Sequence, residues 1–186
     1  MENIELKQLG ETMIDSSMVF DGKILHVYND SVKLPNDNTA TREVIRHIGA
    51  VCVVPVLENG DVIVERQYRY PIDQVITEIP AGKLDSADED RLAAAKRELK
   101  EETGYSAEKW TDMGLYYPAA AYSDEKITMY LAEGLSLGER SLDDDEFLNV
   151  VAVPLSELAD DIISGKITDG KTQVAILKAD KILSSR

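Results

Sequence analysis

The sequence is poor in the residues on which several common kinds of site depend. It has one cysteine, Cys52, and two histidines, His26 and His47, in 186 residues. Disulfide bonds within the chain are therefore excluded, and a zinc site or a triad with a histidine base has too few side chains. Cys52 stands among valines, so we expect it to pack in a core rather than act as a nucleophile.

Long apolar runs are also absent. The longest, residues 49–57, is too short to cross a bilayer, and the first five residues lack the basic start and apolar core of a secretory signal. We therefore expect a cytoplasmic protein with no membrane partner. With 44% hydrophobic residues, the chain is long enough to bury a substantial core.

Positive charge is scarce. Twenty Lys and Arg residues face thirty-five Asp and Glu residues, which gives a formal net charge of −15. Such a field repels polyanions and argues against a nucleic-acid partner. A small phosphorylated substrate remains possible if a metal ion and a few arginines make its pocket locally positive.

The segment that follows Gly82 predicts a helix over residues 87–103. Ser86 and Glu89 have the spacing of a capping box at its start, and Gly104 is the type of residue that ends a helix. Apolar residues repeat at helical spacing and predict a buried stripe: Leu92, Ala95 and Leu99.

Three carboxylates share one face of this helix: Glu98, Glu101 and Glu102. Like charges at this spacing oppose helix formation by roughly 0.2–0.5 kcal/mol per pair. Arg97 can pair with Glu101 but cannot neutralise all three acids. Oxygen ligands without His or Cys nearby favour a hard divalent cation, Mg²⁺ or Mn²⁺ in its place. The alternative for an isolated acidic pair is a solvated helix face.

The full pattern decides between these interpretations. Read from Gly82 to Tyr105, the stretch resembles the Nudix box, G-x5-E-x7-R-E-U-x-E-E-x-G-U, with one extra residue before Glu89. The insertion falls in the loop before the helix, where length changes are tolerated, and keeps the acidic turn in register. The resemblance implies a Nudix hydrolase, and so many fixed positions make it a strong signal.

Residues 66–70 and 78–82, with Arg42 further upstream, are similar to the ADP-ribose pyrophosphatase branch of that family. The resemblance implies that Glu98, Glu102 and the carbonyl of Ala81 bind Mg²⁺ and that Glu101 completes the cluster. The resemblance also implies a set of residues near the diphosphate or sugar: Arg42, Arg66, Arg69, Glu78 and Glu125. For Arg66 an ordinary surface charge is the favoured interpretation, whereas for Arg69 a guanidinium that recognises phosphate is favoured.

The resemblance also implies a general base in the acidic loop at residues 143–146, where we prefer Glu146 to Asp144. A solvated loop is an alternative of nearly equal weight. After the box, residues 116–121 keep only the first proline of a turn that many members of the branch carry. GDP-mannose or another nucleoside-diphosphate sugar therefore stays open beside ADP-ribose.

The order of elements predicts an α/β/α sandwich with a mixed sheet, preceded by a small antiparallel β subdomain. Residues 1–47 are expected to form the β subdomain, which contributes to a homodimer and to the substrate site, and residues 48–186 the Nudix domain. The expected strands lie at residues 9–13, 19–20, 24–34, 40–48, 50–56, 62–69, 75–79, 110–116, 127–132 and 147–153. Two helices are expected at the carboxyl end, over residues 156–163 and 171–183.

A competing motif lies near the end of the chain. Residues 165–172 satisfy G-x4-G-K-[ST], the phosphate loop of nucleotide hydrolases. That loop needs a preceding buried strand, whereas a helix is expected here, so we disfavour it. A third hypothesis is a Nudix-like sensor that binds a nucleotide sugar without cleaving it, although the three repelling carboxylates argue against this.

Overall fold

The computed structural model describes residues 9–142 and 147–186, which fall into two compact units. One unit comprises Met1–His47 together with Ala119–Glu125, and the other comprises Ile48–Pro118 together with Lys126–Arg186. The expected division after residue 47 therefore differs in one segment, residues 119–125. None of the described helices is long and apolar enough to cross a lipid bilayer.

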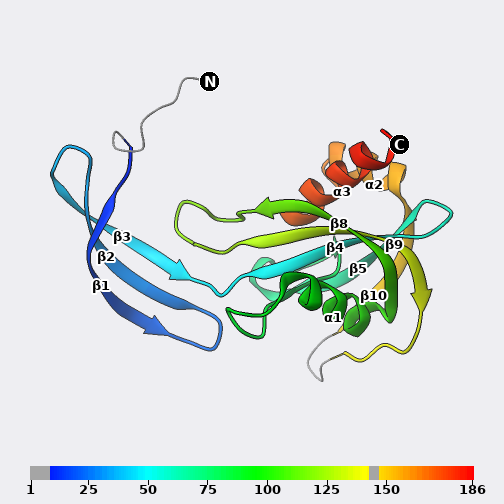
Figure 1. Ribbon diagram of the computed structural model, residues 1–186, viewed down its shortest axis with the longest axis horizontal. Helices are drawn as coiled ribbons and strands as arrows, with labels where there is room; N and C mark the ends of the chain where they lie inside the picture. Colours follow the sequence, from blue (N-terminus) through cyan, green and yellow to red (C-terminus); the bar gives the residue numbers. More distant parts are fainter. Residues whose placement is uncertain (1–8, 143–146) are drawn as a thin grey trace. The chain divides into compact units, whose positions relative to one another are not determined.

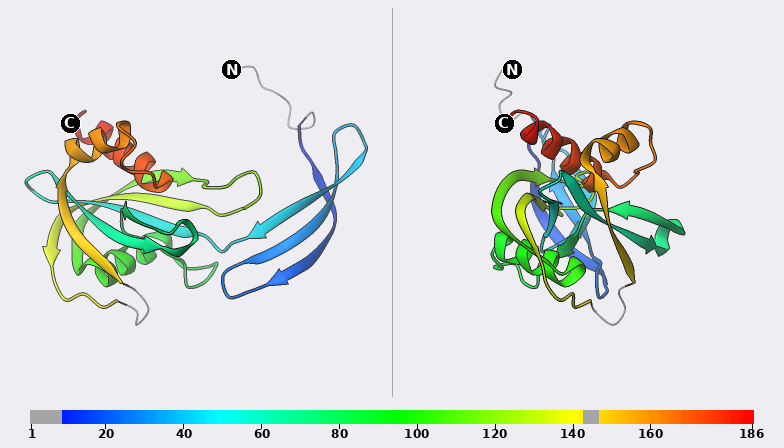
Figure 2. Two further views of the ribbon diagram at one scale, coloured as in Figure 1. Left: turned by 180° about the vertical axis from the view of Figure 1, so that it is seen from behind. Right: turned by 90° about the vertical axis from the view of Figure 1, so that its right-hand side faces the viewer.

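The smaller unit is a three-stranded antiparallel sheet in the order β1-β2-β3 (Figure 2). Its strands are β1 (Thr12–Asp21), β2 (His26–Lys33) and β3 (Thr39–Arg46). The two short strands expected over residues 9–13 and 19–20 are instead the single strand β1, because β2 pairs with nearly its whole length across two irregularities. A turn connects β2 and β3, with Asp37 at a φ of 65°.

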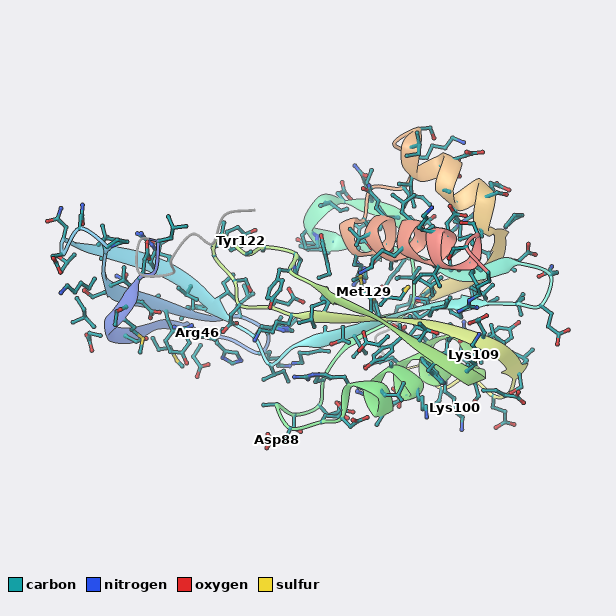
Figure 3. The ribbon with its side chains drawn as sticks, turned by 45° about the horizontal axis from the view of Figure 1, so that its top comes forward. Arg46, Asp88, Lys100, Lys109, Tyr122 and Met129 are labelled. Carbon is teal, nitrogen blue, oxygen red and sulfur yellow. The ribbon has the colours of Figure 1, made fainter. Side chains whose placement is uncertain are left out.

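Residues 119–125 join this unit through the backbone of β3. The N–H of Ile45 donates to the carbonyl of Tyr122 at 2.8 Å, and the N–H of Asp124 donates to the carbonyl of Ile45 at 3.2 Å. The Asp124 carboxylate also accepts a bond from the N–H of His47 at 2.8 Å. Figure 3 labels Tyr122 in this loop and Arg46 at the end of β3. These contacts are non-local, so spacing along the chain did not predict them.

The larger unit is built on a seven-stranded mixed sheet in the order β10-β5-β4-β9-β8, to which β6 and β7 add by pairing with β5 and β4. β4 and β9 are parallel, and the other pairs are antiparallel. The strand bounds are β4 (Ala50–Val56), β5 (Asp61–Arg69), β6 (Gln74–Glu78), β7 (Ala81–Lys83), β8 (Tyr105–Tyr116), β9 (Ile127–Leu137) and β10 (Leu148–Pro154), and a short 3-10 helix, η2 (Tyr70–Ile72), precedes β6.

Helices cover both faces of this sheet, as the sequence predicted. Figure 1 shows α1 (Arg91–Thr103) on one face and α2 (Leu155–Ile163) with α3 (Gly170–Leu183) on the other. Side chains of the buried strand β4 pack on both faces of the sheet. Val51 and Val53 pack in the cluster with α1, whereas Cys52 and Val54 pack in the cluster with α2 and α3. Cys52 is fully buried, which confirms its packing role. The α/β/α arrangement is confirmed.

Candidate active site

The helix that carries the acidic face begins four residues later than expected. Asp90, not Ser86, is its N-cap, and the Asp90 carboxylate accepts a bond from the N–H of Ala93 at 2.8 Å. The predicted capping box is wrong because the Glu89 carboxylate accepts from the N–H of Asp85 at 2.7 Å instead. The predicted end is confirmed, since Gly104 closes the helix with a φ of 79°.

The helix places its acids at different depths. Glu98 and Glu102 are buried and Glu101 is half-buried, whereas Lys100, labelled in Figure 3, lies on the exposed side. This follows from the buried stripe: Leu99 is fully buried in the cluster with Val51 and Val53 of β4, and α1 also contacts β7.

Arg97 is the cation of this face. Its Nη1 bonds to Glu98 Oε1 at 2.8 Å and to Glu101 Oε2 at 3.1 Å, which confirms the predicted i,i+4 pair. Its other nitrogens lie 3.4 Å from carboxylate oxygens of Asp85 and Glu89. Burial by itself would lower the pKa of Arg97, but the surrounding carboxylates outweigh it and raise the pKa. Arg97 is therefore a permanent charge that orients the acids.

Glu102 has a different environment. Its Oε2 accepts a hydrogen bond from the backbone N–H of Ala81 at 3.0 Å. Ala81 begins β7 and pairs with Cys52 of β4. The bond therefore ties the acidic helix to the strand that carries the carbonyl expected to bind metal.

Gly82 explains why the acidic face can come so close to β7. A Cβ built on Gly82 would lie 2.1 Å from Glu98 Cδ and Oε1 and 2.3 Å from Oε2. Real Cβ atoms essentially never come within 3.0 Å of another heavy atom in this way. The Glu98 carboxylate thus occupies the space that any side chain at position 82 would fill.

A cavity of about 220 Å³ opens at this point. Its lining is mostly charged or polar and consists of Ala81, Gly82, Lys83, Asp85, Arg97, Glu98, Glu101 and Ser141. Carboxylate and backbone oxygens of this kind suit a hard divalent cation, and neither His nor Cys is among the lining residues. The residues present therefore fit the expected metal in their chemistry.

The arrangement of these acids is set by their protein partners. Within residues 9–142 and 147–186, no three His, Cys, Asp or Glu side chains converge as a metal-binding group. Arg97 bonds to Glu98 and Glu101, while Glu102 turns to the N–H of Ala81. The assignment of Glu98, Glu101, Glu102 and Ala81 as ligands stays a prediction.

Arg69 and Glu78, expected near the substrate, form a bidentate pair. Arg69 Nε donates to Glu78 Oε1 at 2.5 Å, and Nη2 donates to Oε2 at 2.9 Å. The hydrogen bonds that Arg69 donates to Glu78 raise the pKa of Arg69, and the negative charge of Glu102 raises it further. Arg69 therefore lies within electrostatic reach of the acidic face, with its side chain 43% exposed.

The remaining expected residues are on β5, in the smaller unit or outside the described residues. Arg66 is exposed on β5. Arg42 belongs to the smaller unit, where its guanidinium bonds to Glu11 and to the carbonyl of Thr41. Glu125 also belongs to that unit and donates its N–H to Ser123. The preferred base, Glu146, and its alternative, Asp144, lie outside the described residues.

The segment that matches a phosphate loop does not have the context of one. It follows α2 rather than a strand and leads into α3, whose N-cap is Asp169. The Lys171 ammonium bonds to Asp169 Oδ2 at 3.0 Å and to Glu78. The contact between Lys171 and Glu78 was not predicted from the sequence, because 93 residues separate the two partners.

The chain is similar to several known proteins. A family model described as NUDIX domain matches residues 46–171. An ADP-ribose pyrophosphatase of Bacillus subtilis is 40% identical over 92% of this chain and 93% of its own length. An ADP-ribose pyrophosphatase of Mycobacterium tuberculosis is 33% identical over 88% of this chain and 80% of its own.

Two further likenesses bear on substrate and fold. A GDP-mannose pyrophosphatase of Yersinia enterocolitica is 30% identical over 80% of this chain and 83% of its own length. The crystal structure of an ADP compounds hydrolase superposes with a TM-score of 0.84 at 23% identity, covering 94% of this chain and 95% of that one. That structure supports the fold alone.

Proposed function

This chain belongs to the Nudix family and is a Nudix hydrolase, and from that premise we propose that it hydrolyses ADP-ribose to AMP and ribose 5-phosphate with Mg²⁺. Enzymes of this family generally use divalent metal cations and its relatives act on nucleotide sugars. The single observation that carries the proposal is the acidic face of α1, packed on Gly82 beside a polar cavity.

The residues of the larger unit take the following roles. Glu98, Glu101, Glu102 and the Ala81 carbonyl would hold the cation, which when bound lowers the pKa of a water and neutralises charge on the diphosphate. Arg97 keeps Glu98 and Glu101 in place through its two bonds. Arg69, held by Glu78, offers a guanidinium to phosphate oxygens.

Three further assignments complete the proposal. Glu146 is the expected general base, with Asp144 as the alternative. Arg42 and Glu125 are expected to approach the sugar or diphosphate, Arg42 by way of a second copy of the chain. The cytoplasmic location and the substitution of Mn²⁺ for Mg²⁺ stay predictions.

Analysis of reaction products tests the proposal. The purified chain is incubated with ADP-ribose and Mg²⁺, and equal amounts of AMP and ribose 5-phosphate are expected, with none after the metal is chelated. One water is consumed for each phosphoanhydride bond broken. Binding of ADP-ribose without release of AMP would contradict the proposal and favour a sensor.

GDP-mannose is the second candidate substrate. The likeness to a GDP-mannose pyrophosphatase and the altered turn at residues 116–121 favour including it. A panel of nucleoside-diphosphate sugars, compared by kcat/KM, separates the two candidates. We expect ADP-ribose to rank first, and a higher value for GDP-mannose would reverse the assignment.

We also propose a homodimer that uses the amino-terminal sheet. Every residue of β1 is exposed, and five of them are large and apolar, between 48% and 60% exposed: Met13, Ile14, Met18, Val19 and Phe20. An apolar strand of this kind is typical of an interaction surface. We expect dimers in sedimentation, and monomers after Met18→Glu with Phe20→Glu. A stable, active wild-type monomer would contradict the proposal.

A further inference from the structure

Lys171 is a largely buried lysine that the proposed reaction does not use. Its side chain is only 13% exposed, and its ammonium lies between two carboxylates, those of Glu78 and Asp169. Burial alone would lower the pKa of Lys171, but Asp169 and Glu78 reverse the effect and raise it. A lysine is rarely buried without such partners, so its placement requires an explanation.

The partner that links Lys171 to the site is Glu78. Its carboxylate is 4% exposed and binds two cations: Arg69 bonds to both oxygens, and Lys171 bonds to Oε2. Burial by itself would raise the pKa of Glu78, but Arg69 and Lys171 lower it, so the group stays ionised. The Glu78 carboxylate therefore pairs with two cations: the Lys171 side chain is 13% exposed and the Arg69 side chain is 43% exposed.

The cap of α3 holds this arrangement against the sheet. Asp169 Oδ2 accepts bonds from the N–H of Thr172 at 3.0 Å and from its hydroxyl at 2.6 Å. The same hydroxyl oxygen accepts a bond from the N–H of Ile79 at 3.0 Å. Thr172 is fully buried, and its hydroxyl connects the first turn of α3 to the backbone directly after Glu78.

The charges explain what Lys171 contributes. Without it, Glu78 and Arg69 would cancel one another, and Asp169 would leave an excess negative charge beside an anionic substrate. With it, the four charges balance, and the exposed guanidinium of Arg69 keeps its attraction for phosphate oxygens. The bond to Oε2 also fixes the plane of the Glu78 carboxylate, and with it the direction of Arg69.

We propose that Lys171, seated by the Asp169–Thr172 cap, is a positioning residue that holds Glu78 and thereby presents Arg69 to the diphosphate of the substrate. This inference rests on the proposed function, in which Arg69 contacts the diphosphate. It also gives a role to the residues that resemble a phosphate loop: their lysine acts on the phosphates through Glu78 and Arg69.

The test is a double-mutant cycle between Lys171→Met and Arg69→Ala, with ADP-ribose and Mg²⁺. In the wild-type background, Lys171→Met should raise KM about tenfold and change kcat by less than about threefold, which corresponds to about 1.4 kcal/mol of binding. In the Arg69→Ala background it should change KM by less than about twofold. Lys171→Arg, which keeps the charge, should restore most of the affinity.

A second readout does not depend on turnover. The dissociation constant of ADP-ribose is measured by calorimetry with Mg²⁺ in a Glu102→Gln background. Lys171→Met should raise this constant by the same factor of about ten that is expected for KM. Lys166→Met is the matched control, because Lys166 lies in the loop before α3, pairs with Asp161 of α2 and has a side chain that is 72% exposed. It should leave KM unchanged.

The outcomes separate the two proposals. If wild-type protein releases no AMP, the proposed function fails; if it does but the cycle is additive, the positioning role alone fails. Lys171→Gln replaces Lys171→Met if the latter does not fold, as judged by circular dichroism. If neither variant folds, Lys171 serves the stability of the fold and the positioning role is overturned.

Discussion

Replacing Gly82 by alanine tests whether the position of the Glu98 carboxylate matters for the reaction. The new Cβ would lie 2.1 Å from Glu98 Cδ, whereas ordinary contacts begin at 3.4 Å, so the carboxylate has to retreat by about 1.3 Å. Gly82 is not among the glycines with positive φ, so alanine introduces no backbone strain there. The substitution therefore moves one carboxylate and little else.

The expected loss of stability is modest. A displaced Glu98 costs about 0.5–1.5 kcal/mol if it is forced off a favourable rotamer. It also loses its 2.8 Å bond to Arg97, a partner 27% exposed, which we set at about 1 kcal/mol after allowing for solvent. Together these costs should lower the free energy of unfolding by about 1.5–2.5 kcal/mol, and the protein should still fold.

The expected loss of activity is larger. A misplacement of about 1 Å in a group that organises a reaction can cost about 100-fold in rate, or about 2.7 kcal/mol. We therefore expect kcat/KM for ADP-ribose to fall about 100-fold in Gly82→Ala, measured at saturating Mg²⁺ by release of AMP. Titration of Mn²⁺ followed by electron paramagnetic resonance should show weaker binding of the ion.

Gly138→Ala is the matched control. Gly138 also lacks a positive φ, and among the described residues a Cβ there would meet only the carbonyl of Gly104, at 3.5 Å. Both activity and stability should stay close to wild type. Wild-type kcat/KM in a folded Gly82→Ala protein would refute the reasoning, because the reaction would then be indifferent to where Glu98 lies.

Three other predictions use the same protein. Glu102→Gln should lower kcat/KM at least about 100-fold. The free energy of unfolding should change by under about 1 kcal/mol, because the amide oxygen can still accept a bond from the N–H of Ala81. Wild-type rates would contradict the assignment of Glu102 to the site. Burial raises the pKa of Cys52 from 9.0 to about 12, so the folded state holds this proton more tightly than the unfolded state. The free energy of unfolding should therefore fall as the pH rises from about 9 to 12, and it should fall less in Cys52→Ala. The pKa of Glu78 is lowered from 4.5 by Arg69 and Lys171 against the effect of burial, so the unfolded state binds the proton more tightly. The free energy of unfolding should therefore fall as the pH drops through 4.5 toward that lower pKa. When it is measured by urea titration at several pH values, it should depend less steeply on pH in Glu78→Gln than in the wild type.

Local signals predicted much of the fold because each depends on neighbouring residues. The apolar run of β4 and the helix end at Gly104 both lie where they were expected. The start of α1 was missed because Ser86 and Asp90 are equally good N-caps, and the choice was made by what the Glu89 carboxylate contacts. β7 was missed because three residues after a proline carry no period of their own.

The site was predictable to the extent that it is written in one helix. The motif identified Arg97 and the three glutamates together, since their spacing puts them on one face. The fit of Glu98 against Gly82 depends on how closely β7 approaches the helix, which no pattern in the sequence states. The bond from Lys171 to Glu78 joins residues 93 positions apart and follows only from the packing of α3 on the sheet.

The charges around this site give a reason why a nucleotide sugar should need a divalent cation. Three cations around the site are already paired: Arg97 bonds to Glu98 and Glu101, while Arg69 and Lys171 share Glu78. Glu102 adds a further negative charge beside Ala81, in a chain whose net charge is −15. A diphosphate that enters this region gains little net attraction from the protein alone. We therefore expect the KM for ADP-ribose to fall steeply as Mg²⁺ is raised, and a KM independent of the ion would mean that the acidic face is not where the diphosphate binds.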